Sequence, residues 1–198
     1  MSAVTEAEAP SAPLHTGRRR VRPRRRPFLT AALLLLAALA GYAAWANLRP
    51  VQLTASTEVR ATPQQVWKVL STLEDYPRWN PFITRAEVTS EGGRLREGAT
   101  LRNRMHDRGG DSVFTPRVES LVAGKELSWL GKAGPGWIVD GRHRFVIERI
   151  APDRVRFTQS ERFTGVLVPF LQDRLTKDTL PQFHAMNKAL KDRIEAAR

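Results

Sequence analysis

The sequence predicts an α+β domain in which an antiparallel sheet packs against a long C-terminal helix. Residues 51–164 contain short stretches of alternating apolar and polar side chains, separated by turns that contain glycine. After Val166 the apolar side chains recur every three or four residues, which is typical of an amphipathic helix. Such a helix needs an apolar surface to cover, and the inner face of the sheet is the available one.

The N-terminal residues 1–27 have a different composition from the rest. They consist largely of Ala, Pro, Glu, Ser and Thr, which cannot bury enough apolar surface to fold. They also carry seven arginines: Arg18, Arg19, Arg20, Arg22, Arg24, Arg25 and Arg26. We therefore predict a disordered, basic tail.

The next segment, residues 28–48, contains no charged side chain. As a helix it would span the hydrocarbon core of a bilayer, which is about 30 Å thick. The positive-inside rule places the arginines in the cytoplasm and the domain at 52–198 outside it. Tyr42 and Trp45 lie near the outer end, where amphipathic aromatic side chains prefer the membrane interface. The sequence therefore predicts a single-pass transmembrane helix.

An export signal that is later cleaved is the alternative for the same segment. The sequence RRPFLT at 25–30 resembles a twin-arginine signal, and AWA at 44–46 fits an A-x-A cleavage site. The apolar run is longer than the roughly 7–15 residues of a usual signal core, which favours a retained anchor. Both interpretations place the folded domain outside the cytoplasm.

Seven strands are predicted in the domain, and the short connections between them indicate an antiparallel sheet. Arginines occupy one parity of several of these strands, which indicates a solvated outer face. The predicted strands are 51–60, 83–91, 98–106, 111–123, 125–132, 137–150 and 153–164.

A short helix begins after the first strand. Thr62 and Gln65 have the spacing of a capping box, and Pro63 falls at the first helical position. The following sequence YPRWNPFI contains Pro77 and Pro81, which restrict the backbone of a turn rich in aromatic residues around Asn80.

The C-terminal helix is predicted from Val166 to the end of the chain. Pro181 lies inside the helical pattern, so we expect a kink or a break there. The apolar positions that define the pattern are Leu171, Leu175, Phe183, Met186, Leu190 and Ile194.

Several kinds of site are not expected. The chain has no cysteine, its four histidines are widely separated, and no phosphate-binding glycine loop or serine-hydrolase motif occurs. We therefore expect no metal and no cofactor. The net charge of +12 comes from arginines scattered along the strands, without the stripe or aromatic signature of a nucleic-acid-binding surface.

Three polar side chains are predicted on the inner face of the last two strands. Alternation places His143, Gln159 and Glu161 among inward apolar residues. If the hairpin near Pro152 pairs Ile147 with Phe157, His143 lies directly opposite Glu161. These groups satisfy one another structurally, orient the polar end of a ligand, or supply acid–base chemistry.

The order of these pieces resembles the START-related ligand-binding superfamily (SRPBCC), in its bacterial polyketide cyclase/dehydrase-like and lipid-transport branch. The resemblance rests on VWKVL at 66–70, YPRWNPFI at 76–83, KELSW at 125–129, GRHRF at 141–145, QSERFTG at 159–165 and FHAMNKALKDRIE at 183–195. It implies a helix-grip fold, with an antiparallel sheet wrapped around the C-terminal helix and an apolar cavity between them.

The resemblance does not imply one function, because members range from lipid carriers to cyclases. The leading prediction is a domain that is tethered to a bacterial cytoplasmic membrane and binds a lipid or another hydrophobic small molecule. Two alternatives remain: a cyclase or dehydratase that uses His143 and Glu161, and an interaction domain with a vestigial cavity. The candidate ligand-binding residues are Trp67, Trp79, Asn80, Phe114, Trp129, Trp137, His143, Phe145, Phe157, Gln159, Glu161, Phe183 and Met186.

Overall fold

The computed structural model describes residues 27–107 and 110–197. The chain divides into two compact units, residues 1–36 and residues 37–198. The predicted basic tail lies outside the described residues. Helix α1 (Pro27–Asn47) coincides within one residue with the predicted apolar segment, and it is long and apolar enough to cross a membrane.

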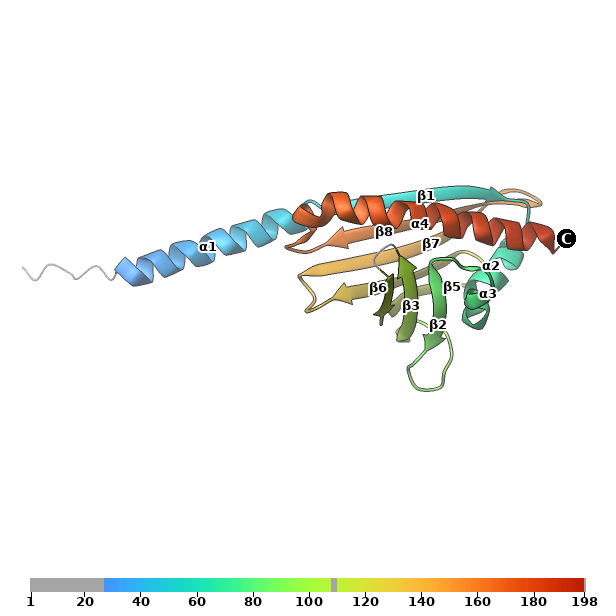
Figure 1. Ribbon diagram of the computed structural model, residues 1–198, viewed down its shortest axis with the longest axis horizontal. Helices are drawn as coiled ribbons and strands as arrows, with labels where there is room; N and C mark the ends of the chain where they lie inside the picture. The colour runs from blue at the N-terminus through green and yellow to red at the C-terminus, as the bar shows by residue number, and fades with distance from the viewer. Residues whose placement is uncertain (1–26, 108–109, 198) are drawn as a thin grey trace, which may run out of the picture. The chain divides into compact units, whose positions relative to one another are not determined.

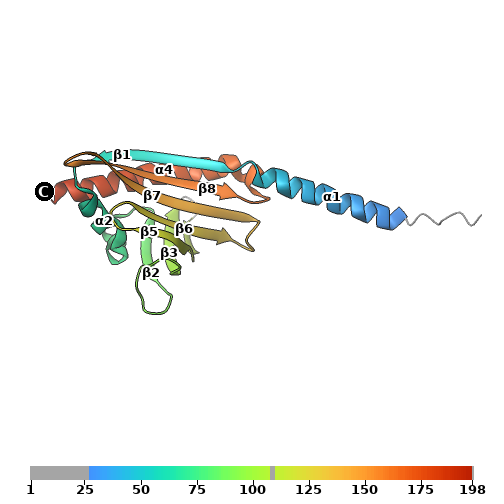
Figure 2. The same cartoon turned by 180° about the vertical axis from the view of Figure 1, so that it is seen from behind.

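The main sheet has five antiparallel strands in the order β1-β8-β7-β6-β5, which Figures 1 and 2 show from opposite sides. Its strand bounds are β1 (Val51–Val59), β5 (Arg117–Val122), β6 (Glu126–Ala133), β7 (Val139–Ala151) and β8 (Arg154–Thr164). The arginines that alternate along β7 and β8 are exposed, as predicted for the outer face.

A second sheet of three antiparallel strands, in the order β2-β3-β4, holds the remaining strands that the structure describes. These are β2 (Ile83–Val88), β3 (Leu101–Asp107) and β4 (Gly110–Phe114). Hydrogen bonds join the two sheets: Leu101 N–H donates to Pro116 O at 2.8 Å, and Val118 N–H donates to Ala99 O at 2.8 Å.

The predicted fold class, an antiparallel sheet with a long C-terminal helix, is confirmed, but the described residues form eight strands in two sheets and not seven strands in one. The predicted strand 111–123 is two strands, β4 and β5, which belong to different sheets. The division falls at Thr115 and Pro116. Proline has no N–H for a ladder and restricts the residue before it, so the strand ends there.

Helix α2 (Pro63–Ser71) begins with the predicted capping box. Gln65 N–H donates to Thr62 Oγ1 at 3.3 Å, and Thr62 N–H donates to Gln65 Oε1 at 2.8 Å. These bonds satisfy donors that the first helical turn leaves unpaired.

A short 3-10 helix η1 (Leu73–Asp75) and helix α3 (Tyr76–Trp79) follow α2. The Tyr76 hydroxyl donates to Leu70 O at 2.7 Å and is completely buried. Burial raises the pKa of this phenol above its ordinary value.

Helix α4 (Val168–Ala196) packs on the main sheet and runs alongside β1 (Figure 1). Its C-terminal half packs directly on the sheet: Phe183, Met186 and Leu190 are completely buried, and Asn187 Nδ2 donates to Ala55 O at 3.1 Å.

The helix continues through Pro181. Of the two expected outcomes, a kink or a break, the break does not occur. Proline in a helix interior costs about 3 kcal/mol. Burial of the apolar side chains after Pro181 offsets this cost, because each contributes about 1.5–3 kcal/mol.

Candidate functional site

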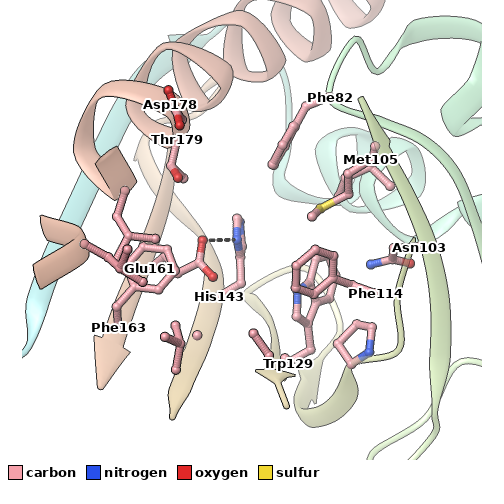
Figure 3. A pocket seen from close by; sticks show the side chains of 18 of the residues that line it. Phe82, Asn103, Met105, Phe114, Trp129, His143, Glu161, Phe163, Asp178 and Thr179 are labelled. Atoms are coloured by element: carbon pink, nitrogen blue, oxygen red, sulfur yellow. Dashed lines mark ion pairs between the residues drawn. The ribbon is translucent and has the colours of Figure 1, made fainter. Parts of the chain in front are cut away.

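A cavity of about 410 Å³ lies in the domain between the two sheets and the N-terminal half of α4. Such a volume suits a small-molecule site, and the lining is mainly apolar, as predicted. Figure 3 shows the side chains from β3, β4 and β6 facing those from β7, β8 and α4. The lining includes Phe82, Ile83, Met105, Phe114, Trp129, Val139, Phe163, Leu171 and Leu175, with the polar Asn103, His143, Glu161, Arg174, Asp178 and Thr179.

His143 on β7 and Glu161 on β8 form the principal polar pair of this cavity. The register pairs Ile147 with Phe157, Phe145 with Gln159, and His143 with Glu161, as predicted. His143 Nδ1 lies 3.3 Å from Glu161 Oε2, and the two side chains are 5% and 16% exposed. Figure 3 shows them pointing toward one another.

Aromatic rings fix the orientation of His143. Its imidazole is stacked on Trp129 with ring centroids 5.3 Å apart, and it meets Phe145 at 4.5 Å and Phe183 at 5.0 Å. Its Nε2 is buried and has no hydrogen-bond partner among the described residues. A buried polar atom without a partner is costly, so Nε2 is suited to bind a polar group of a ligand.

The absence of a side chain at Gly141 leaves space for the Glu161 carboxylate. A Cβ atom at position 141 would lie only 2.4 Å from Glu161 Oε1 and 3.3 Å from Phe163 Cε1. The close approach therefore requires glycine at this position, near the start of β7. Sequence reasoning missed this role, although a glycine inside a strand pattern is itself a signal of such an approach.

Asn103 on β3 is a second polar group at the cavity. Its side chain is 2% exposed, and Oδ1 has no partner among the described residues. Sequence analysis did not select it. Its parity with Leu101 and Met105 is the signal that places it on the inner face.

The structure separates the predicted site residues other than Trp137 into four groups. Phe114, Trp129, His143 and Glu161 line the cavity. Beyond it, the buried core contains a group under the C-terminal half of α4: Phe145, Phe157, Gln159, Phe183 and Met186. Gln159 Nε2 donates to the sulfur of Met186 at 3.6 Å, so this polar side chain points into the core.

The other two groups lie away from the cavity lining. Trp67 and Trp79 are partly buried against the core near α2 and α3. Asn80 closes a turn: its Oδ1 accepts from the N–H groups of Phe82 and Ile83, both at 2.9 Å.

Trp137 was predicted to point inward, which is wrong: it is 58% exposed. Strand β7 begins at Val139 rather than at residue 137. The backbone of Trp137 has φ 150°, so the alternation of the strand does not extend to it.

Solved structures of known proteins share this fold. A START superfamily protein from Mycobacterium smegmatis is 22% identical, with a TM-score of 0.56 over 74% of this chain and 99% of that one. The Zhui aromatase/cyclase from Streptomyces sp. R1128 is 14% identical, with a TM-score of 0.61 over 76% of this chain and 97% of that one. Norcoclaurine synthase from Thalictrum flavum is 14% identical, with a TM-score of 0.59 over 75% and 96%.

No curated protein sequence matches the chain significantly. A sequence profile described as polyketide cyclase / dehydrase and lipid transport matches residues 50–195. This segment contains both sheets, α2 to α4 and every side chain of the cavity. The chain therefore belongs to the polyketide cyclase / dehydrase and lipid transport family, and its domain has the fold of the START superfamily protein.

Proposed function

We propose that the domain holds a lipid or another hydrophobic small molecule in its cavity, outside the cytoplasm and tethered to the membrane. The observation that carries this proposal is the apolar cavity of about 410 Å³ with a buried, partly unpartnered polar pair at one wall. Ligand sites of this kind gain affinity from apolar contact and orientation from a few placed polar groups.

The polar groups define which end of the ligand they bind. His143 and Asn103 both line the cavity, and the imidazole Nε2 and the amide Oδ1 have no hydrogen-bond partner among the described residues. A hydroxyl or other hydrogen-bond donor on an otherwise apolar molecule would pair with them. The ring surfaces of Trp129 and Phe114 would then contact its apolar part.

The membrane part of the proposal divides the chain into a cytoplasmic tail at 1–27, a transmembrane helix at 28–48 and the domain at 52–198. Contacts within residues 37–198 support a retained helix. Ala46 is completely buried, and the Tyr42 hydroxyl donates to Val166 O at 2.5 Å. Cleavage after Ala46 would remove both contacts from the domain.

An enzyme is the second candidate, and the His143–Glu161 pair is the observation that favours it. A carboxylate 3.3 Å from an imidazole is the minimum arrangement for general acid–base work. The same geometry also serves a binding site, in which the carboxylate holds the imidazole in one orientation. We favour binding, because Nε2 of His143 has no hydrogen-bond partner among the described residues that would complete a relay.

An interaction domain with a vestigial cavity is the third candidate. It would be favoured by a long helix packed flush on the sheet. The first half of α4 is not packed flush, because a cavity lies beneath it.

Extraction of the full-length chain from its native membrane tests the binding proposal. We expect mass spectrometry of the purified protein to find one hydrophobic compound in near-stoichiometric amount. A variant with Gly131→Trp, which fills the cavity beside Phe114, provides the control and should lose the compound. The same compound in equal amount on both proteins, or none in several detergents, would contradict a cavity ligand.

Topology and processing need separate measurements. A reporter fused after Arg198 should be active only when it is of the kind that works outside the cytoplasm. The mass of the mature chain separates a retained helix from a signal that is cleaved near Ala46.

A further inference from the structure

We propose that four exposed apolar side chains at one end of the domain lie in the membrane interface and bring the adjoining end of the cavity to the lipid. The four, named here the apolar rim, are Trp45, Trp137, Leu167 and Phe170. This inference rests on the proposed function, because it requires the helix at 28–48 to be a membrane anchor.

The apolar rim is unusual for its exposure. Phe170 is 76% exposed and Trp137 is 58% exposed, although both are large and apolar. Isolated exposed apolar residues need no explanation, but a group of them indicates an interaction site. Tryptophan in particular is enriched at membrane interfaces, because its ring is apolar and its N–H is polar.

Hydrogen bonds hold the rim segments together. Val166 N–H donates to Trp137 O at 2.9 Å, and Leu167 N–H donates to Ile138 O at 3.2 Å. Gly165 has φ 131°, and a Cβ at that position would lie 2.4 Å from Ile138 O. The connection before β7 and the start of α4 are therefore fixed against one another.

The backbone of Trp137 is strained in a way that exposes its ring. Its φ of 150° is rare for a residue with a side chain. Strain of this kind destabilises the fold and persists only where the surrounding structure imposes it, commonly at functional positions. Here the hydrogen bonds to the carbonyl groups of Trp137 and Ile138 hold the backbone in this conformation, and the indole is exposed to solvent.

The contact of the rim with the C-terminal part of helix α1 indicates that the partner of the rim is membrane lipid. The ring of Tyr42 lies 5.8 Å from Trp45 and 6.2 Å from Phe170, measured between centroids. Tyr42 precedes the helix end at Asn47 by five residues, or about 7.5 Å along the helix axis. Apolar groups at interfaces reach about 5–10 Å into the boundary between headgroups and acyl chains. If α1 spans the bilayer, Phe170 is therefore at that depth.

Basic side chains beside the rim fit lipid headgroups. The Arg49 guanidinium lies 5.1 Å from the centroid of the Trp45 ring. The Lys132 side chain lies against Gly136, one residue before Trp137. Cationic groups next to aromatic ones are typical of the headgroup region, where anionic lipids attract them.

The rim also adjoins the cavity. Ala133 and Val139, on either side of the connection that carries Trp137, line the cavity, and so does Leu171, which follows Phe170. A rim buried in the interface would therefore place this end of the cavity next to the lipid. A hydrophobic ligand could then pass between bilayer and cavity without crossing water.

Site-specific fluorescence in reconstituted vesicles tests the proposal. The chain has no cysteine, so single substitutions give one labelled position each. Phe170→Cys and Trp137→Cys probe the rim through two different segments, and Leu34→Cys probes the proposed span. Val122→Cys is the matched exposed apolar control. Val122 ends β5 and pairs with Glu126 at the start of β6, whereas the rim adjoins the end of β6 at Ala133. Each full-length protein would carry an environment-sensitive dye in vesicles of phosphatidylglycerol and phosphatidylethanolamine.

We expect lipids with a quencher on the upper acyl chain to reduce emission at positions 170 and 137 by about twofold more than at position 122. Aqueous iodide should show the opposite order. Equal quenching at 170, 137 and 122, with strong lipid quenching at 34, would overturn the rim while leaving the anchor intact. Protection from both quenchers at 170 would point to a protein partner and would also overturn it. Absence of lipid quenching at 34 would refute the anchor and the rim together, whereas the co-purified ligand is measured independently.

Discussion

Nδ1 of His143 lies 3.3 Å from Oε2 of Glu161, across the central strand pair β7 and β8 and at the wall of the cavity. The arrangement depends on Gly141, which leaves space for the carboxylate, and on Trp129, on which the imidazole is stacked. The pair thus has a defined geometry before any ligand enters. A preorganised polar group loses little entropy on binding, which suits the recognition of one polar group on an apolar ligand.

Glu161→Gln tests the role of the carboxylate. The change keeps the shape of the side chain and removes its charge. We expect affinity for the co-purified ligand to fall about tenfold, because one charge-assisted interaction in the site is weakened. Displacement of a fluorescent hydrophobic probe measures this. Glu148→Gln, an exposed position on the same strand pair, is the control and should bind normally.

The same variant separates binding from catalysis. If a substrate is found, turnover should survive the loss of the carboxylate. A loss of turnover by several orders of magnitude with unchanged binding would identify Glu161 as a catalytic base and contradict the binding role.

Gly141→Ala tests the space around the carboxylate without changing its chemistry. The added methyl would lie 2.4 Å from Glu161 Oε1, so the carboxylate must leave the position that it holds beside His143. We expect about the same tenfold loss of affinity as for Glu161→Gln, with a cost of about 1 kcal/mol in the free energy of unfolding. Both quantities come from probe displacement and chemical denaturation.

Gly131→Ala is the matched control for that change. Its methyl would enter the same cavity but would be in ordinary contact with Gly141 O at 3.8 Å and Phe114 Cδ1 at 3.9 Å. It therefore removes a similar volume without displacing the carboxylate. Equal losses in the two variants would mean that volume, and not the position of Glu161, controls affinity.

The polar pair could be predicted from the sequence because local rules determine it. A short connection near Pro152 fixes the register of β7 and β8, and strand alternation fixes the face. The capping box at Thr62 is equally local. The family resemblance supplied the grip arrangement and the cavity, which periodicity alone does not give.

The extent of the cavity could not be predicted in the same way, because it depends on what covers each part of a strand face. His143 and Phe145 share one face of β7, yet only His143 lines the cavity. Phe183, in the C-terminal half of α4, belongs to the same buried core as Phe145, whereas Leu171 and Leu175 in the N-terminal half line the cavity. Alternation identifies a face and contains no information on the distance of the helix above it.

Glu126→Gln should change stability in a pH-dependent manner. Arg144 Nη2 donates to Glu126 Oε2 at 2.6 Å, and this bond lowers the pKa of the carboxyl below its ordinary value of 4.5. A depressed pKa stabilises the fold above the unfolded-state value, and the contribution is lost as the pH falls through the folded-state value. The charge is partly exposed, so we expect less than about 1 kcal/mol at pH 7.

Denaturant titrations between pH 3 and pH 7 would measure the difference between wild type and the Glu126→Gln variant. The difference should be largest at neutral pH and should shrink below about pH 4.5, the ordinary value for this carboxyl. Glu91→Gln, on an exposed loop, should show no such trend. A difference that stays constant over this range would show that the ion pair is not its source.

Asn80→Ala distinguishes a structural asparagine from a ligand contact. In the structure Asn80 is buried, and its Oδ1 accepts two backbone N–H groups, those of Phe82 and Ile83, each at 2.9 Å. Removal of the acceptor leaves two buried donors unpaired, which should cost about 2–3 kcal/mol in the free energy of unfolding. Because Phe82 and Ile83 line the cavity, ligand affinity should fall with stability.

Asn80→Asp keeps the accepting oxygen and should lose less stability at neutral pH. Chemical denaturation of the three proteins, with probe displacement on the same samples, measures both effects. A fall in affinity without a fall in stability would mean that Asn80 contacts the ligand directly, as the sequence suggested. Because Asn80 accepts two hydrogen bonds from the turn, we expect instead that stability falls, and that affinity falls with it because the wall of the cavity has moved.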